Sequence, residues 1–90
     1  MQIKSVSDFR AAYRAGKYAW PGGYPKYFVA ADGEALSWEA VASNIREVLH
    51  GIAHGGPRDE WNVVAVEINW EDPDLTCSHT GSKIESAYAD

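Results

Sequence analysis

The stretch that decides the fold is "KYFVAADGEALSWEAV", residues 26–41. Its first residues are rich enough in aromatic and β-branched side chains to predict a strand. Asp32-Gly33 is a tight-turn signal, so we expect residues 26–37 to form a β-hairpin. Ser37 then stands at the position of a helix N-cap, and Glu39 lies where the positive end of a helix dipole favours a carboxylate. The stretch therefore predicts a hairpin that leads directly into a helix.

The helix is expected over residues 38–54. Its apolar side chains recur at helical spacing and form one stripe, made of Trp38, Val41, Ile45, Val48, Leu49 and Ile52. Gly55-Gly56-Pro57 ends the pattern. His50 and His54 fall on the opposite, outward side. A shorter helix is expected near the N-terminus in "SVSDFRAAYRAGK", residues 5–17, capped by Ser5 or Ser7, with Phe9 and Tyr13 on one face and Gly16 at its end.

A strand is expected over residues 62–70, within "WNVVAVEINWEDP". Strict alternation would point four side chains toward the core, namely Val64, Val66, Ile68 and Trp70. Val63 and Ala65 would be half-buried on the other face, which continues through the wetter Glu67, Asn69 and Glu71. Pro73 ends the strand. The tail, residues 81–90, offers Ile84 and Tyr88 as docking residues.

These elements predict a single α+β domain over residues 1–90. A small antiparallel sheet, made from the hairpin and the later strand, would be covered on one face by the 38–54 helix. A hydrophobic content of 46% and four tryptophans indicate a real core. One cysteine excludes an intramolecular disulfide framework, which favours a reducing, cytoplasmic setting. The sequence contains neither a signal-peptide pattern nor an apolar run long enough for a membrane span.

The charge balance is acidic, with 8 basic and 13 acidic residues and a net charge of −5. Binding to nucleic acid through phosphate contacts requires clustered Lys and Arg, so direct nucleic-acid binding is not expected. An acidic surface suits a basic partner, or it serves solubility alone. Both interpretations stay open at this point.

The segment "YAWPGGYP", residues 18–25, contains a Pro-Gly-Gly core that excludes regular helix and central strand. It lacks the Lys-Ser/Thr of a phosphate-binding loop. One interpretation is a fixed turn that packs Trp20, Tyr24 and Tyr27 together. The other is an exposed binding hot spot made of Tyr18, Trp20 and Tyr24, because aromatic anchors dominate protein interfaces. We add Glu67, Glu71 and Asp72 to the candidate binding residues because of their charge.

The segment "LTCSHTGSKIESAY", residues 75–88, has the outline of half a zinc site. Together with "YAWPGGYPKYFVAADG" and "INWEDP", it resembles a family of small, mostly uncharacterised proteins of phages and mobile elements. That family combines a Tyr-Ala-Trp-Pro-Gly-Gly-Tyr-Pro motif, an Asp-Gly turn, a Cys-x-x-Cys pair, and a Cys-x-His-Cys-Gly pair followed by Ser-Ala-Tyr. The resemblance extends over residues 9–88.

In such relatives the four cysteines would close a zinc ribbon. Carried over by position, they fall at Ser37, Ala40, Cys77 and Thr80, so three of the four ligands are missing. The resemblance therefore implies a vestigial site with no metal and no cofactor. Because a structural zinc contributes on the order of 10 kcal/mol to folding, we expect a cluster of Trp38, Ile84 and Tyr88 to replace it.

Two other kinds of chemistry are open. Cys77 and His79 could join His50 and His54 in a new metal site, but two distant loops would have to fold over the outer helix face. Six acidic residues late in the chain could support acid–base catalysis if a pair were buried: Asp59, Glu60, Glu67, Glu71, Asp72 and Asp74. They flank turns, so we expect them to be solvated and the protein not to be an enzyme.

The leading expectation is a non-catalytic accessory protein of a phage or mobile element, which binds a host or phage protein in the bacterial cytoplasm. Inhibition of a host defence system such as CRISPR is the specific form, and an acidic protein could occupy the basic groove of a nucleic-acid-binding complex. One rival is a zinc-ribbon-like regulator that binds metal and nucleic acid. The other is a small acid–base hydrolase.

Overall fold

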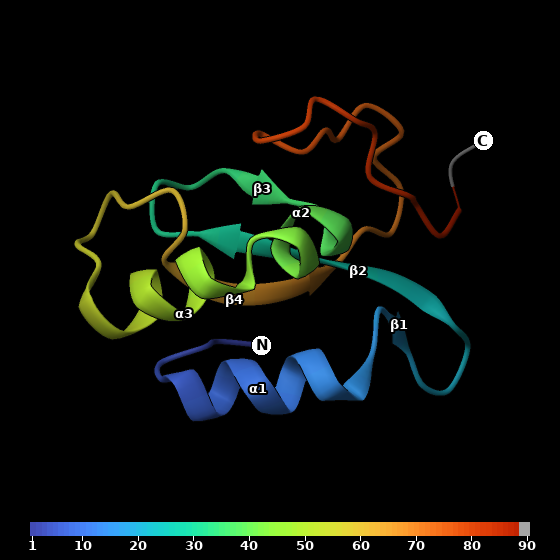
Figure 1. Ribbon diagram of the computed structural model, residues 1–90. Helices are drawn as coiled ribbons and strands as arrows, with labels where there is room; N and C mark the ends of the chain where they lie inside the picture. The colour runs from blue at the N-terminus through green and yellow to red at the C-terminus, as the bar shows by residue number, and fades with distance from the viewer. Residues whose placement is uncertain (89–90) are drawn as a thin grey trace.

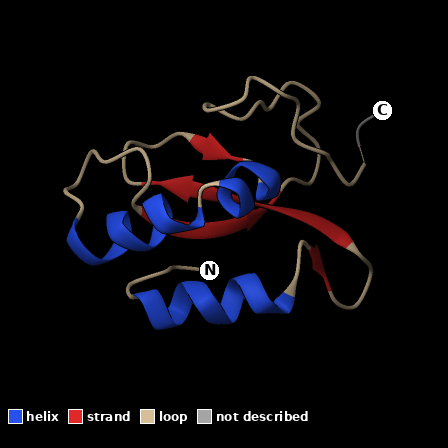
Figure 2. Ribbon diagram, in the orientation of Figure 1, coloured by secondary structure: helices blue, strands red, loops and turns tan. Residues whose placement is uncertain are grey.

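The computed structural model describes residues 1–88 and has the expected α+β architecture (Figures 1 and 2). The helices are α1 (Val6–Ala15), α2 (Trp38–Ser43) and α3 (Ile45–His54). The strands are β1 (Tyr18–Ala19), β2 (Tyr24–Ala30), β3 (Ala35–Leu36) and β4 (Val63–Ile68). None of the described helices is long and apolar enough to cross a lipid bilayer.

The central strand of the sheet is β2, and every strand pair is antiparallel. β4 pairs with β2 over Lys26–Ala30, whereas β3 pairs with Phe28 and Val29 across the predicted Asp-Gly turn. β1 pairs with the first two residues of β2. Figure 1 shows α2 and α3 against one face of the sheet and α1 beside them. The small antiparallel sheet packed on helices is therefore confirmed.

Four aromatic rings form the centre of the core. Phe28 of β2 lies 5.5 Å from Phe9 and 4.5 Å from Trp38, measured between ring centroids. Tyr13 closes the circle at 5.7 Å from Phe9 and 5.6 Å from Trp38. Because these rings come from α1, β2 and α2, the cluster joins all three elements. Such ring pairs stabilise a fold beyond the area that they bury.

Both predicted N-caps are present. The Ser5 hydroxyl accepts a hydrogen bond from the Asp8 amide, and Ser37 does the same for Ala40 at the start of α2. Gly16, at a φ of 95°, ends α1 as expected. The hairpin also forms as predicted, although β2 begins two residues earlier, because Tyr24 and Pro25 pair with β1.

The prediction of one continuous helix over residues 38–54 is wrong. The chain breaks at Asn44, whose φ of −129° and ψ of 38° are not helical. The Asn44 side-chain amide donates a hydrogen bond to the Ala40 carbonyl at 2.8 Å, so it competes with the backbone for the helical acceptor. The apolar stripe still faces the core, since Val41 and Val48 are buried and Ile45 is half-buried.

The inward face of β4 was predicted only in part, since Val66 is buried as expected. Val63 is fully buried, whereas Val64 is 36% exposed and Trp70 is 47% exposed. The pairing of β2 with β4 shifts between Val29 and Ala30, so that Val64 is an extra residue in the ladder. This β-bulge brings Val63 onto the face of Ala30, because one inserted residue reverses the alternation.

Candidate functional site

Three aromatic rings, those of Tyr24, Trp70 and Tyr88, pack on one another at the start of β2, and two exposed rings lie just before them in the chain, in β1 and the turn after it. We call this set the aromatic patch; it consists of Tyr18, Trp20, Tyr24, Trp70 and Tyr88. Trp20 is 93% exposed, and Tyr88 and Trp70 also present large apolar surfaces to solvent. The interpretation that Trp20 packs with Tyr24 and Tyr27 is therefore wrong. The alternative interpretation, an exposed aromatic surface, agrees with this geometry.

The turn between β1 and β2 sets the geometry of the patch. Gly22 and Gly23 both have positive φ values, 107° and 68°, which glycine adopts without strain. A Cβ atom on Gly22 would lie 2.6 Å from Cε2 of Tyr24, so the ring folds over this glycine. Tyr24 then lies 4.7 Å from Trp70 and 5.9 Å from Tyr88, between ring centroids. The turn therefore fixes three rings against one another.

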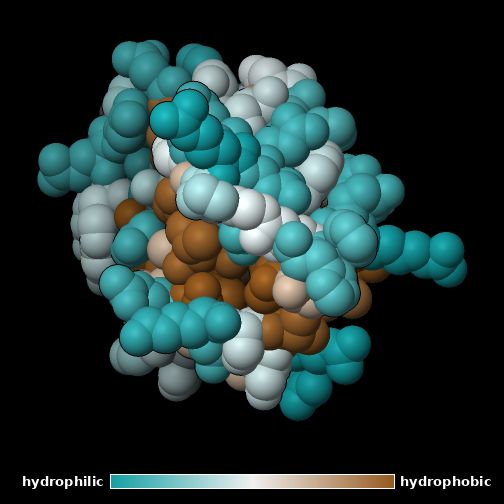
Figure 3. All heavy atoms as spheres, turned by 90° about the vertical axis from the view of Figure 1, so that its left-hand side faces the viewer, coloured by the Kyte–Doolittle hydropathy of each residue, from teal (hydrophilic) through white to brown (hydrophobic). Residues whose placement is uncertain are grey.

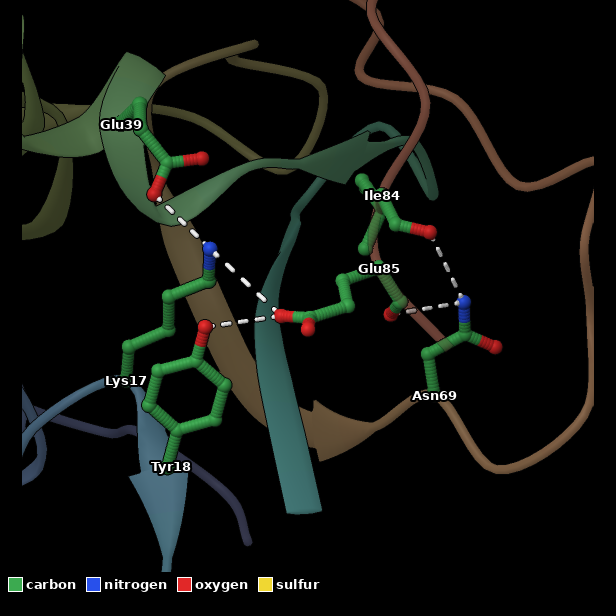
Figure 4. Close-up of polar contacts among 6 residues, drawn as sticks. All are labelled: Lys17, Tyr18, Glu39, Asn69, Ile84 and Glu85. Atoms are coloured by element: carbon green, nitrogen blue, oxygen red, sulfur yellow. Dashed lines mark hydrogen bonds and ion pairs between the residues drawn. The ribbon is translucent and has the colours of Figure 1, made fainter. Parts of the chain in front are cut away.

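Asn69 holds the tail against this end of the sheet (Figure 4). Its side-chain amide donates hydrogen bonds to the carbonyls of Ile84, Glu85 and Asp72, at 3.3, 3.2 and 3.0 Å. Asn69 was expected to be exposed to solvent, but this is wrong, because the residue is only 4% exposed. A buried amide with these partners ties the chain after β4 to the tail. The Tyr88 amide can therefore reach the Trp70 carbonyl, at 2.9 Å.

Glu85 connects the tail to the start of the patch. Its carboxylate accepts a hydrogen bond from the Tyr18 hydroxyl at 2.8 Å and lies 3.9 Å from the Lys17 amine (Figure 4). That hydrogen bond is the main reason why the pKa of Tyr18 is raised. Burial acts to lower the pKa of Lys17, but the Glu39 carboxylate at 3.2 Å, with help from Glu85, raises it on balance. Residues from three segments thus share one charge network.

The predicted acidic binding residues lie around this end of the sheet. Glu67 is exposed and lies 3.9 Å from the amine of Met1. Glu71 and Asp72 are exposed in the turn that follows β4. Burial, and then the charges of Glu67 and Asp72, raise the pKa of the Tyr27 hydroxyl. Glu67 and Asp72 thus lie near Tyr27, which is not a member of the aromatic patch, and no described interaction joins the carboxylates of Glu67, Glu71 or Asp72 to a ring of the patch.

Sequence patterns missed Trp70, Tyr88 and Glu85 as members of this site. Strict alternation assigned Trp70 to the core, and Tyr88 was expected to dock there with Ile84. The strand was predicted to continue toward Pro73, but β4 stops at Ile68, so Trp70 lies beyond the regular ladder and the alternation does not apply to it. Ile84 is indeed buried, at 7% exposure, but Tyr88 packs on the patch.

Cys77 lies at the second candidate location, the four positions that the sequence resemblance assigns to a lost zinc site. It is 1% exposed and begins a turn closed by the Gly81 amide, which donates to the Cys77 carbonyl. Ser37 and Thr80 each hydrogen-bond to the thiol through backbone and side chain. Ser37 also accepts from the Ala40 amide, so all four positions are linked by hydrogen bonds. Trp38 and Ile84 belong to the same core as Cys77, whereas Tyr88 does not.

The histidines do not assemble around Cys77. His50 and His54 are exposed neighbours on α3, with ring centroids 5.2 Å apart. His79 packs on Trp61 at 4.8 Å. Within residues 1–88, no three His, Cys, Asp or Glu side chains come close enough to hold a metal ion.

The six late acidic residues are dispersed. Asp59 accepts a hydrogen bond from the Trp61 amide, and Asp72 accepts one from the Asp74 amide, so both carboxylates fix turns. Glu60, Glu67 and Glu71 are exposed. The acidic residues therefore form no single buried pair of the kind that acid–base chemistry needs, among the residues that the structure describes.

Comparisons of the chain with protein-family models, with curated proteins and with solved structures find no match.

The environment of Cys77 predicts a pH-dependent stability. Burial acts to raise the pKa of its thiol, but the hydrogen bonds from Ser37 and Thr80 outweigh burial and lower the pKa from 9.0 to about 7. The folded protein therefore releases this proton at a lower pH than the unfolded chain. The contribution to stability is complete above about pH 9 and is lost as pH falls through about 7, with a total of about 2 to 3 kcal/mol.

The measurement is urea unfolding from pH 6 to 9 under reducing conditions, for the wild type and for Cys77→Ala. The wild-type free energy of unfolding should rise relative to that of the variant over this range. Subtracting the variant removes the contributions of the histidines and the other titrating groups. Parallel curves for the two proteins would show that the thiol keeps its proton when folded.

Proposed function

We propose that this protein is a non-catalytic binding module that uses the aromatic patch to bind another protein. The observation that carries the proposal is Trp20, which is 93% exposed in the turn between β1 and β2, directly before Tyr24 and the two exposed rings packed on it, Trp70 and Tyr88. A soluble domain gains nothing for its own folding from such a side chain. Exposed tryptophan and tyrosine are the residues that most often dominate binding energy in protein interfaces.

The charges around the patch support a basic partner. Glu85 accepts a hydrogen bond from Tyr18, Glu67 lines a hollow together with Trp70, and Glu71 and Asp72 directly follow Trp70 in the chain. The chain as a whole carries a net charge of −5. Exposed carboxylates around an apolar centre steer a basic surface toward it and increase the association rate. Tyrosine and tryptophan rings also bind Lys and Arg side chains through cation–π contacts.

The specific form of the proposal follows from the sequence resemblance. A small accessory protein of a phage or mobile element, cytoplasmic in its bacterial host, would meet basic surfaces on nucleic-acid-binding complexes. Inhibition of a host defence complex of the CRISPR type is the function that this combination suggests. The zinc positions at Ser37, Ala40, Cys77 and Thr80 are then a trace of ancestry with no part in binding.

The test is affinity purification of the tagged protein from expressing bacterial cells, with the double variant Trp20→Ala/Trp70→Ala in parallel. Hot-spot truncations of this kind cost about 2 kcal/mol or more each, so the variant should retain at least about tenfold less of a specific partner. His54→Ala, an exposed change on α3, is the matched control and should retain it fully. Equal retention by both variants, or no retained protein with the wild type, would contradict the proposal.

A further inference from the structure

An apolar groove lies between α1 and α3, away from the aromatic patch. It has a volume of about 350 Å³ and is lined by Phe9, Tyr13, Ile45 and Leu49, with Arg10 and Arg14 on the α1 side. Figure 3 looks at the molecule from the end where α1 begins and α3 ends, and it shows apolar side chains at the surface within a hydrophilic border. The two helices thus leave part of the core edge uncovered.

The charge at this groove is opposite to that of the rest of the chain. Arg10 and Arg14 line it, whereas Arg46 lines a different hollow together with Glu47 and Asp59. Arg10 and Arg14 are two of the four arginines in a protein with a net charge of −5. Within residues 1–88, the ion pairs involve only the N-terminal amine and Lys17, so these two guanidinium groups have no carboxylate partner.

The nearest acidic residues on the two helices do not neutralise this basic border. Asp8 accepts a hydrogen bond from the Lys4 amide and lies in the first turn of α1. Glu47 is exposed in the first turn of α3. A guanidinium group with five donors and no partner is well suited to bidentate binding of a carboxylate.

We propose that the groove between α1 and α3 binds an amphipathic helical segment of a partner protein that carries acidic side chains beside its apolar ones. The half-buried Tyr13, Ile45 and Leu49 would receive apolar anchors at helical spacing, as in other helix-in-groove complexes. Arg10 and Arg14 would bind the flanking carboxylates. An apolar floor favours a peptide over nucleic acid, because the charged phosphates of a nucleic-acid backbone lose hydration there without gaining a partner.

This surface is independent of the aromatic patch, because the two differ in location and in the charge of the partner that they fit. One small domain would then have two interfaces, one bordered by acidic residues and the other by basic residues. Loss of either interface can be measured without affecting the other, so a failure of the proposal on the patch leaves this one standing.

The experiment is a titration of isotope-labelled protein followed by NMR, with defined peptides as probes. The acidic amphipathic probe is Ac-ELLEEILDELLEEA-NH2; a basic probe replaces each acidic residue with Lys, and a polar probe replaces each Leu and Ile with Gln. We expect the acidic probe to shift the amide signals of residues 9–14 and 45–49. The other two probes should bind at least about tenfold more weakly.

The variant Arg10→Glu/Arg14→Glu should weaken binding of the acidic probe by about tenfold or more. Both side chains are exposed, and the dispersion of the NMR spectrum checks that the variant is folded. Arg58→Glu is the matched control, since it removes the fourth arginine from the exposed loop after α3, and it should change the affinity by less than about twofold.

Three results would overturn the proposal. They are equal binding of the basic or polar probe, shifts that map outside the groove, and equal loss of affinity in Arg58→Glu. A (dT)15 oligonucleotide serves as a further arm. If it binds the same residues more tightly than the acidic peptide does, the partner is a nucleic acid and the proposed peptide is wrong.

Discussion

Replacing Trp38 with alanine is expected to lower the free energy of unfolding by about 3 to 5 kcal/mol. Trp38 is 9% exposed and stacks on Phe28 at 4.5 Å and on Tyr13 at 5.6 Å. Lys26 also lies over its ring, with the amine 5.4 Å from the centroid. Removing the indole would open a cavity where α1, α2 and β2 meet. A loss of this size is a large part of the stability of a small domain.

The effect is measured by thermal and urea unfolding of the variant and the wild type. At about 4 °C or more per kcal/mol for a domain of this length, the midpoint should fall by more than about 12 °C. Trp20→Ala is the matched control, because it removes the same side chain from a position that is 93% exposed and should change stability by no more than about 0.5 kcal/mol. If Trp38→Ala unfolds near the wild-type temperature, the idea that this ring replaces a lost metal site is wrong.

The triple variant Ser37→Cys/Ala40→Cys/Thr80→Cys is expected to bind one zinc ion per chain. Cys77 already receives hydrogen bonds from Ser37 and Thr80, and Ser37 is bonded to the amide of Ala40. Four cysteines at these positions would therefore start close together, as tetrahedral coordination requires. Without metal, the triple variant loses the N-cap hydrogen bond of Ser37, and the new thiols do not replace it. We therefore expect the metal-free variant to be less stable than the wild type by about 1 kcal/mol.

Zinc should then raise the stability of the triple variant by several kcal/mol, since structural sites contribute on the order of 10 kcal/mol at neutral pH. Metal analysis, unfolding with and without a chelator, and the absorption spectrum of the cobalt form test this directly. The same variant with Cys77→Ala, which keeps three cysteines, should bind much more weakly. Absence of stoichiometric zinc in the four-cysteine protein would show that the four positions never formed a metal site, and the sequence resemblance would lose its structural basis.

Local signals in the sequence were sufficient wherever one segment decides its own conformation. Ser5, Ser37 and the Asp32-Gly33 turn act within a few residues, and each takes the predicted role. The apolar stripe of residues 38–52 also faces the core as predicted. The break at Asn44 was missed because helical periodicity continues across it, and only the hydrogen bond from Asn44 to Ala40 ends the first helix.

The errors in β4 have a different origin. Alternation along one strand says which side chains share a face, but it holds only while the ladder is regular. The shift between Val29 and Ala30 belongs to the pairing with β2, so nothing in "WNVVAVEINW" reveals it. The burial of Asn69 was missed because it also depends on distant segments. Its side chain donates hydrogen bonds to residues that lie 15 and 16 positions later in the chain.

The sequence by itself determined the caps, the turns, the apolar faces of the helices and the single α+β core, because these depend on neighbours along the chain. Only the tertiary structure decided which aromatic side chains are exposed. Tyr24, Trp70 and Tyr88 come from three distant segments, and they meet because Asn69 ties the tail to the end of β4. The same holds for Cys77, whose thiol acquires its properties from Ser37, forty residues earlier in the chain, through contacts that only folding creates.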